Sequence, residues 1–216
     1  MSFVVAIDGP AASGKGTLAR GLAERFGLAH LDTGSLYRAT AFIALEAAAD
    51  PADPEAAERA ARQVTPGLLA DPRLRDERVG AAASVVAAIP QVRQALLEFQ
   101  RHFAAHPPPA KKGAVLDGRD IGSVVCPDAS VKLFVTASLE ARADRRLKEL
   151  RERGEPAIYE TVLLDLKERD ARDTLRRAAP LRAAPGAVTI DTTALDAAQV
   201  LERVSQLIAR SPDAAR

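Results

Sequence analysis

The chain has 216 residues, a length at which a single domain can bury a substantial core. Its 30 basic and 29 acidic residues almost cancel, so no global field draws the protein toward nucleic acid or a membrane surface. The single cysteine, Cys126, excludes an internal disulfide and a thiolate metal site, and no apolar run has membrane-spanning length. We therefore expect a cytoplasmic monomer with no nucleic-acid or membrane partner, in which any phosphate binding is local.

Five short apolar runs alternate with longer segments of helical periodicity. The apolar runs predict strands at 3–7, 29–31, 114–116, 131–135 and 188–190. The periodic segments predict helices at 15–26, 35–49, 81–89, 91–106, 139–153, 160–175 and 196–210. Continuous apolar strands that alternate with helices are typical of a buried parallel sheet with helices on both faces. The pattern predicts one domain of the α/β class.

Three segments fall outside this alternation. Residues 63–79 contain Pro66 and Pro72 among charged residues, which favours an insertion rather than core. Residues 107–113 include three consecutive prolines and are predicted to form a stiff, exposed loop. Residues 211–216 are predicted to be a frayed tail.

A phosphate-binding pattern follows the first predicted strand. The sequence D-G-P-A-A-S-G-K-G-T contains G-x-x-x-x-G-K, in which glycines let backbone N–H groups converge on an anion. The next helix adds its positive N-terminal end, and Lys15, expected at an exposed loop-to-helix junction, can reach the β- and γ-phosphates. The predicted ATP-binding residues are Gly9, Pro10, Ala11, Ala12, Ser13, Gly14, Lys15, Gly16 and Thr17.

Two further residues are candidates for holding Mg²⁺. The position after Lys15, usually Ser or Thr in this pattern, is Gly16, and the hydroxyl comes one residue later at Thr17. The predicted strand 114–116 ends in Asp117, an arrangement by which P-loop enzymes hold magnesium directly or through water. The sequence predicts that ATP binds together with Mg²⁺ and that Thr17 and Asp117 hold the ion.

The remaining residues favour a phosphate as the acceptor. The chain has no asparagine for a guanine-reading N-K-x-D and no D-x-x-G element, which argues against a GTPase switch, and its length argues against a transport or motor ATPase. A phosphate acceptor is mostly dianionic at neutral pH and needs positive charge around it rather than a general base. Arginine supplies 24 of the 30 basic residues, the other six being lysines. His30, His102 and His106 have no catalytic or metal spacing and are expected to be solvent-exposed or packing residues.

Five sequence blocks carry a resemblance to a known family. They are I-D-G-P-A-A-S-G-K-G-T, L-D-T-G-S-L-Y-R-A, V-A-A-I-P-Q-V-R-Q-A-L-L, L-D-G-R-D-I-G-S-V-V-C-P-D-A and L-K-E-R-D-A-R-D-T-L-R-R-A-A-P-L. Over nearly its whole length the chain resembles the bacterial cytidylate kinases, which are nucleoside monophosphate kinases. The resemblance implies a five-stranded parallel sheet with helices on both faces, a small monophosphate-binding domain and a lid. It implies a core at about 1–34, 107–138 and 186–210, a monophosphate-binding region at about 35–106 and a lid at about 145–165.

The activity that the resemblance implies is transfer of the γ-phosphoryl group of ATP to CMP or dCMP, which gives ADP and CDP or dCDP. The residues that it places around the acceptor nucleotide are Thr33, Arg93 and Asp120 at the cytosine, Arg38 and Arg119 at the phosphate, and Arg169 and Asp173 at the sugar. It places Arg176 at the transferring phosphate, so the implied catalytic residues are Lys15, Arg119 and Arg176. The predicted helix 139–153 carries five arginines that are candidates for a lid over ATP, and one or two of them are expected to contact phosphate. They are Arg142, Arg145, Arg146, Arg151 and Arg153.

The residue chemistry agrees with this assignment. A cytosine edge offers an amino donor and two acceptors, which a carboxylate, an arginine and a hydroxyl can read. Arg169, Asp173 and Arg176 stand at i, i+4 and i+7 and share one helical face, for which a solvated, salt-bridged surface is the alternative. The stretch 63–79 is shorter than the insert common in bacterial members, so the sugar preference stays open.

Two other functions remain open on the sequence. The phosphate-binding loop is shared with other small P-loop kinases, such as shikimate or dephospho-coenzyme A kinases. A regulatory ATPase that hydrolyses or senses ATP is an alternative from a different class. Neither alternative requires the base-reading set of Thr33, Arg93 and Asp120.

Overall fold

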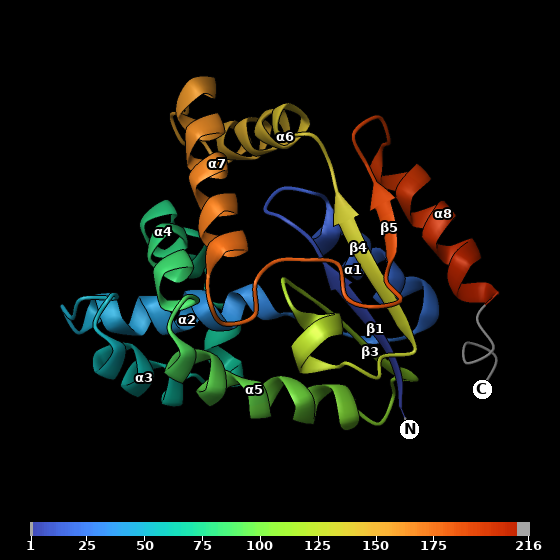
Figure 1. Cartoon of the computed structure of the whole chain (residues 1–216), viewed down its shortest axis with the longest axis horizontal. Helices are drawn as coiled ribbons and strands as arrows, with labels where there is room; N and C mark the ends of the chain where they lie inside the picture. Colours follow the sequence, from blue (N-terminus) through green and yellow to red (C-terminus); the bar gives the residue numbers. More distant parts are fainter. Residues whose placement is uncertain (1, 211–216) are drawn as a thin grey trace.

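Five parallel strands form one sheet at the centre of the protein (Figure 1). The computed structural model describes residues 2–210, so the predicted tail at 211–216 lies outside the described residues. The strands lie in the order β2-β3-β1-β4-β5. Their bounds are Phe3–Asp8 for β1, Ala29–Asp32 for β2, Gly113–Gly118 for β3, Val131–Thr136 for β4 and Val188–Asp191 for β5. All five predicted strands and the α/β class are confirmed.

Helices cover both faces of this sheet. They are α1 (Lys15–Phe26), α2 (Thr33–Glu46), α3 (Pro54–Arg62), α4 (Glu77–Val86), α5 (Pro90–Ala105), α6 (Leu139–Glu152), α7 (Tyr159–Leu175) and α8 (Ala197–Ala209). Figure 1 shows α2 to α5 grouped to one side of the sheet, α8 on the other side, and α6 and α7 beyond the carboxyl end of β4. Helices α6 and α7 therefore lie at the carboxyl ends of the strands, the edge at which open α/β sheets bind ligands.

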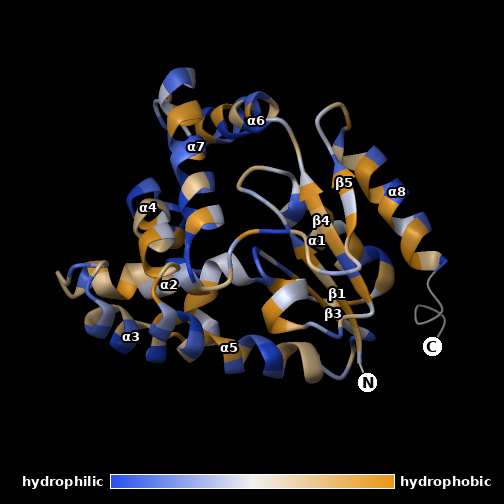
Figure 2. Ribbon diagram, in the orientation of Figure 1, coloured by the Kyte–Doolittle hydropathy of each residue, from blue (hydrophilic) through white to orange (hydrophobic). Residues whose placement is uncertain are grey.

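The alternation of side chains along β1 divides the core into two clusters. Val5 and Ile7 are fully buried against α1 and α8, where they pack with residues such as Leu22 and Val204. Ala6 points to the opposite face and belongs to the cluster built by α2, α4 and α5. Successive residues of a strand point to opposite faces, so one strand serves both clusters. Figure 2 shows the apolar strands and the mixed polar and apolar surfaces of the helices that cover them.

One helix was missed in the sequence, and another begins earlier than predicted. Asp53 caps α3 by accepting a hydrogen bond from the Glu55 N–H at 3.0 Å, and the face that α3 buries consists of alanines, which give a weak hydrophobic period. Helix α4 begins at Glu77 rather than 81 because Asp76 accepts a bond from the Arg78 N–H.

The predicted insertion at 63–79 is short and only partly outside the core. It holds two 3₁₀ turns, η1 (Pro66–Ala70) and η2 (Pro72–Arg75). None of the residues of η1 is buried, whereas Leu74 and Val79 are. The segment therefore packs at its C-terminal end against the helices that precede and follow it.

The helices were also compared with the length and composition that crossing a membrane requires. Among residues 2–210, no single helix is long and apolar enough. Helices α4 and α5 meet the criterion only as a pair, with a bend of 100° between them.

Candidate nucleotide and phosphate site

The loop between β1 and α1 requires glycine at two positions. At position 9 an added Cβ would lie 2.0 Å from the carbonyl oxygen of Val135, so only glycine fits against β4. Gly14, the N-cap of α1, has a φ of 89°, in the left-handed region that glycine adopts without strain. The loop thus turns tightly at both ends and directs the start of α1 toward the space that it encloses.

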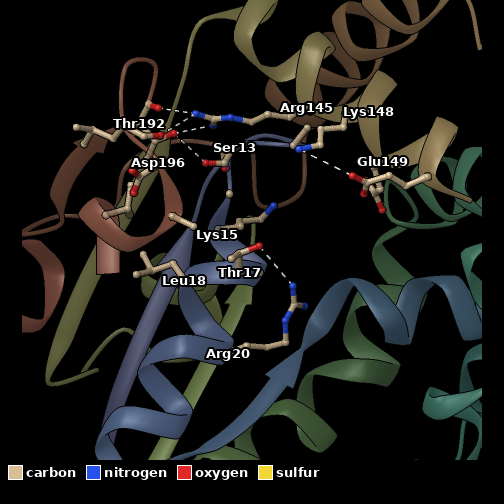
Figure 3. A pocket seen from close by; sticks show the side chains of 17 residues that line it. Ser13, Lys15, Thr17, Leu18, Arg20, Arg145, Lys148, Glu149, Thr192 and Asp196 are labelled. Atoms are coloured by element: carbon tan, nitrogen blue, oxygen red, sulfur yellow. Dashed lines mark hydrogen bonds and ion pairs between the residues drawn. The ribbon is translucent and has the colours of Figure 1, made fainter. Parts of the chain in front are cut away.

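A cavity of about 690 Å³ opens over this loop. It is lined by residues 12–17, by α6 and by the segment before α8, and Figure 3 shows how side chains from these elements face it. Arg145 donates to the Thr192 hydroxyl at 2.9 Å, and this hydroxyl donates to the Ser13 carbonyl oxygen at 3.1 Å. The volume lies in the range of small-molecule sites. Thr192 and Asp196 were not predicted, since no pattern around them points to a ligand.

Lys15 differs from the expectation of an exposed junction. Its side chain is buried, and Nζ donates to the Pro10 carbonyl oxygen at 3.2 Å. Burial, and next the positive charge of Arg119, lower the pKa of Lys15 to about 7. A buried ammonium beside another cation is stabilised by an anion, and a nucleotide phosphate in the loop would supply one.

Asp117 lies against the first turn of α1. A Cβ added at Gly16 would lie 3.6 Å from Asp117 Oδ2. Its other oxygen lies 2.8 Å from Nε2 of His30, so His30 has a polar contact in the site, which the sequence did not predict. Withdrawal from water, and next the charge of Asp117, raise the pKa of neighbouring Asp32. Two neighbouring carboxylates at the phosphate-binding loop suit a divalent cation nearby.

Thr17 and Asp117 alone would provide too few ligands to complete the coordination of a cation. Among residues 2–210, no group of three or more His, Cys, Asp or Glu side chains could hold a metal ion. Thr17 is exposed at the mouth of the loop. Mg²⁺ in phosphate-transfer sites is commonly held by one or two protein ligands with waters and phosphate oxygens. Asp117 and Thr17 fit that mode.

Most of the residues expected around the acceptor form one buried ionic network. Arg93 pairs with Asp120, and Arg119 Nε donates to Asp173 Oδ2 at 2.7 Å. Arg176 connects the two pairs, with Nη2 at 4.0 Å from Asp120 Oδ1 and Nη1 at 3.9 Å from Asp173 Oδ1. Burial raises the pKa of Asp173, but the charge and hydrogen bond of Arg119 act against it, and the pKa lies below its ordinary value. The face shared by Asp173 and Arg176 is therefore not a solvated surface.

Thr33 and Arg38 lie on α2, at the edges of this network. The Thr33 hydroxyl is buried and donates to the Asp117 carbonyl oxygen at 2.8 Å, which holds α2 against the end of β3. Arg38 donates to the Leu74 carbonyl oxygen at 2.9 Å. Burial, and next Arg146, lower the pKa of Arg38. Both side chains are held by backbone oxygens of other segments.

Two arginines in this region have buried N–H groups without a protein partner. Within residues 2–210, Arg169 Nε and Arg176 Nη2 have no hydrogen-bond acceptor. Burial, and next the charge of Arg119, lower the pKa of Arg169 to about 10. A cavity of about 380 Å³ reaches Arg38 and Arg169 from between α4, α6 and α7. Buried cationic donors without acceptors are costly, which points to an anionic ligand.

The arginines of α6 have different surroundings. Arg145 lines the larger cavity, and Arg146 lines the smaller one. Arg142 is instead buried, where it pairs with Asp170 of α7 at 2.7 Å and donates to the Ala11 and Ala137 carbonyl oxygens. Arg142 therefore connects the phosphate-binding loop to α7 rather than facing the cavity.

Comparison with known proteins places the chain in a family. The family model described as cytidylate kinase matches residues 5–210. The chain is 62% identical over 199 residues to the cytidylate kinase of Paramagnetospirillum magneticum, which covers 92% of this chain and 94% of the relative. It is 55% identical over 207 residues to that of Rhodospirillum rubrum, covering 96% and 97%.

Similar solved structures support the fold. An uncharacterized protein from Eubacterium ventriosum ATCC 27560 superposes with a TM-score of 0.54 at 14% identity, covering 96% of this chain and 99% of its own. Identity at this level bears on architecture alone. The family match and the two relatives, which extend over almost the whole chain, decide the assignment: the chain belongs to the cytidylate kinase family.

Proposed function

We propose that the protein transfers the γ-phosphoryl group of ATP to CMP or dCMP, with ADP as the second product. The observation that carries this proposal is the pair of buried, unpartnered arginine groups on Arg169 and Arg176 beside the Arg93–Asp120 pair. After burial, the charges of Arg119 and, more weakly, Arg169 lower the pKa of Lys15, so this cluster lies close to the phosphate-binding loop. The site for the phosphate donor and the site for an anionic acceptor thus lie at the same edge of the sheet.

In this proposal the chain's cations hold the two phosphates in line. The acceptor phosphate needs no general base, because its second pKa is near 6 and it is mostly dianionic at neutral pH. Lys15 neutralises the donor phosphates, while Arg38 and Arg119 hold the acceptor phosphate. Arg176 is directed at the charge that develops on the transferring group. Removal of water from these buried cations strengthens their attraction for phosphate.

Asp117 and Thr17 would hold Mg²⁺, directly or through water. When bound, this ion would supply positive charge that offsets the negative charge of the donor phosphates. The orientation of Asp117 supports this role, since one of its oxygens faces α1 and the other is engaged by His30.

The base is read by Asp120, Arg93 and Thr33 in this proposal. Asp120 accepts from the cytosine amino group, whereas uracil would present a carbonyl oxygen to the same carboxylate. Arg169 and Asp173 then contact the sugar hydroxyls. The monophosphate-binding region at 35–106 and the lid at 145–165 close over the core segments 1–34, 107–138 and 186–210. We expect a monomer in the cytoplasm.

An acceptor panel tests this function against the alternatives. ADP release from ATP is followed with CMP, dCMP, UMP, shikimate and dephospho-coenzyme A, and with no acceptor. We expect turnover with CMP or dCMP and little with the others. Turnover that is the same without any acceptor would indicate an ATPase, and turnover with shikimate or dephospho-coenzyme A alone would indicate another small kinase.

A further inference from the structure

Asp8 is a buried carboxylate to which neither the phosphate-binding pattern nor the proposed chemistry assigns a role. It is the last residue of β1 and directly precedes Gly9, and it is 2% exposed. Its Oδ1 accepts from the Ile121 N–H at 2.7 Å, and its Oδ2 accepts from the Gly122 N–H at 2.8 Å. Both oxygens therefore bind consecutive backbone N–H groups, in a segment 113 residues further along the chain.

The segment that Asp8 holds begins immediately after Asp120. Ile121 and Gly122 are the first residues of η3, the short helical turn Ile121–Val125. The carbonyl oxygen of Asp120 accepts from the N–H groups inside this turn, including that of Val124 at 2.9 Å. The backbone on the C-terminal side of Asp120 is thus held in place, and this backbone determines where the Asp120 side chain meets Arg93.

We propose that Asp8 is a positioning residue for acceptor choice: it keeps η3 in place relative to the phosphate-binding loop, so that Asp120 presents its carboxylate to the base. Asp8 touches neither substrate in this inference and acts only through the backbone of Ile121 and Gly122. The inference rests on the proposed function, since it requires that Asp120 reads the base.

The chemistry of the contact explains why a carboxylate stands there. A carboxylate has only acceptors to offer, and each of its oxygens faces a donor. Burial raises the pKa of Asp8 to about 6, although the two N–H bonds oppose this shift. An asparagine of nearly equal volume would turn an NH₂ group toward one of the two N–H groups and leave that backbone donor unsatisfied.

Gly122 allows the same contact to be altered from its other side. A Cβ added there would lie 3.4 Å from Asp8 Oδ2 and 3.2 Å from the Ala184 Cβ. The 3.2 Å distance to Ala184 is tight enough to require a small shift, so Gly122→Ala would displace the Gly122 N–H from Asp8 while the carboxylate itself stays intact. Because it adds a single methyl group and keeps the carboxylate, it serves as a second, independent variant of the same contact.

The experiment measures kcat/KM for CMP and for UMP at one ATP concentration. The variants are Asp8→Asn, Gly122→Ala, Asp120→Asn and Val204→Ala, and each is also unfolded in urea. Val204 is a buried residue of α8 outside the acceptor site, so its truncation reports the effect of lost stability alone. We expect Asp8→Asn to lower the CMP-to-UMP ratio about fivefold or more, near the lower end of what a base-edge contact contributes. Gly122→Ala should act in the same direction, Val204→Ala should leave the ratio unchanged, and the KM for ATP should stay close to wild type in all four.

Three results would overturn the inference, and they are distinguishable. If Asp120→Asn lowers the ratio but Asp8→Asn and Gly122→Ala do not, base reading stands and the positioning role is wrong. If Val204→Ala lowers the ratio as much as Asp8→Asn at equal loss of stability, the effect belongs to destabilisation. If Asp120→Asn itself leaves the ratio unchanged, Asp120 does not read the base, and the inference falls with that part of the proposed function.

Discussion

At the scale of single residues, both sites hold cations whose charge is costly until an anion arrives. Burial is the first cause that lowers the pKa of Lys15 to about 7 and that of Arg169 to about 10. Neither shift arises from the local sequence, because the packing that buries the two side chains and the positive charges that lower their pKa values come from other elements. A group tuned in this way reduces the stability of the free protein and increases its affinity for phosphate.

Lys15→Met should separate these two effects. In the unfolded chain the lysine has a pKa near 10.5, and in the folded protein it is about 7. Below pH 7 the lysine is charged in both states, so the full burial penalty is present; the penalty shrinks as the pH rises from 7 to 10.5. In the absence of nucleotide, Lys15→Met should therefore have a higher free energy of unfolding than wild type at pH 6.5, by roughly 1–4 kcal/mol. The difference should be smaller at pH 9.5.

The measurement is urea unfolding of both proteins at these two pH values, together with turnover. Lys15→Met should lose activity by on the order of 100-fold or more, as when a preorganised charge is removed from a transferring group. A variant that is less stable than wild type at both pH values would show that Lys15 is not destabilising. Near-normal turnover would show that the donor phosphates bind elsewhere.

Arg176→Ala should lower kcat much more than it raises the KM for CMP. Its Nη2 group is buried without a hydrogen-bond acceptor, and its nearest carboxylates lie 3.9 and 4.0 Å away, so it is available to charge that appears during transfer. Comparable arginines contribute on the order of 10³-fold in phosphoryl transfer. Steady-state kinetics with saturating ATP decide the matter, and an effect seen in KM alone would make Arg176 an ordinary binding residue.

Asp120→Asn should narrow the preference for cytosine over uracil. The amide can turn its donor toward the uracil carbonyl oxygen, so the repulsion that excludes uracil disappears. The shift in relative kcat/KM should be roughly 1–3 kcal/mol. Because Asp120 also pairs with Arg93, overall activity should fall as well, and the ratio of the two substrates is the decisive quantity.

At the scale of elements, helix α3 shows a contribution to stability that is separate from the site. It buries four alanines and begins at an Asp53 cap. Asp53→Ala should lower the free energy of unfolding by about 1 kcal/mol, the usual effect of losing such a cap. Activity at saturating substrate should not change, since α3 contributes no proposed site residue. Urea unfolding and turnover of the same preparation check both statements, and a large loss of kcat would connect α3 to the closure of the acceptor site.

At the scale of the whole molecule, polar contacts join the region around α4 to α6 and α7. Arg172 donates to the Ser84 hydroxyl at 3.2 Å, Arg153 donates to the Arg75 carbonyl oxygen at 3.2 Å, and Arg146 pairs with Glu77. The Arg153 and Arg146 contacts are exposed, and exposed contacts of this kind contribute little to stability. A cavity of about 380 Å³ lies between the same helices. The contacts are therefore of a kind that can separate and re-form as substrates enter and leave.

Hydrogen exchange should report this movement. With CMP and a non-hydrolysable ATP analogue together, backbone N–H groups of α4 and α7 should exchange more slowly than in the free protein. The analogue alone should protect mainly the phosphate-binding loop and α1. Equal exchange of α4 and α7 in all states would mean that these helices do not close over the acceptor.

Much of the protein could be predicted from its local sequence. The strand β1, the glycines of the phosphate-binding loop and the start of α1 follow from neighbouring residues, because backbone conformation and hydrophobic period act over a few positions. The proposed acceptor residues, such as Arg93 and Asp120, were predicted only through family resemblance. The structure brings these two side chains into contact from positions 27 residues apart.

Only the tertiary structure decided which side chains are buried and with which partners. The burial of Lys15, the contact of His30 with Asp117, and the role of Arg142 within the core each depend on segments that meet after folding. The bonds from Asp8 to Ile121 and Gly122 connect segments more than 110 residues apart. The local sequence therefore determined the strands, most of the helices and the phosphate-binding loop. Desolvation and charge interaction depend on distance in space, so the packing of the sheet and helices determined the electrostatics of the site.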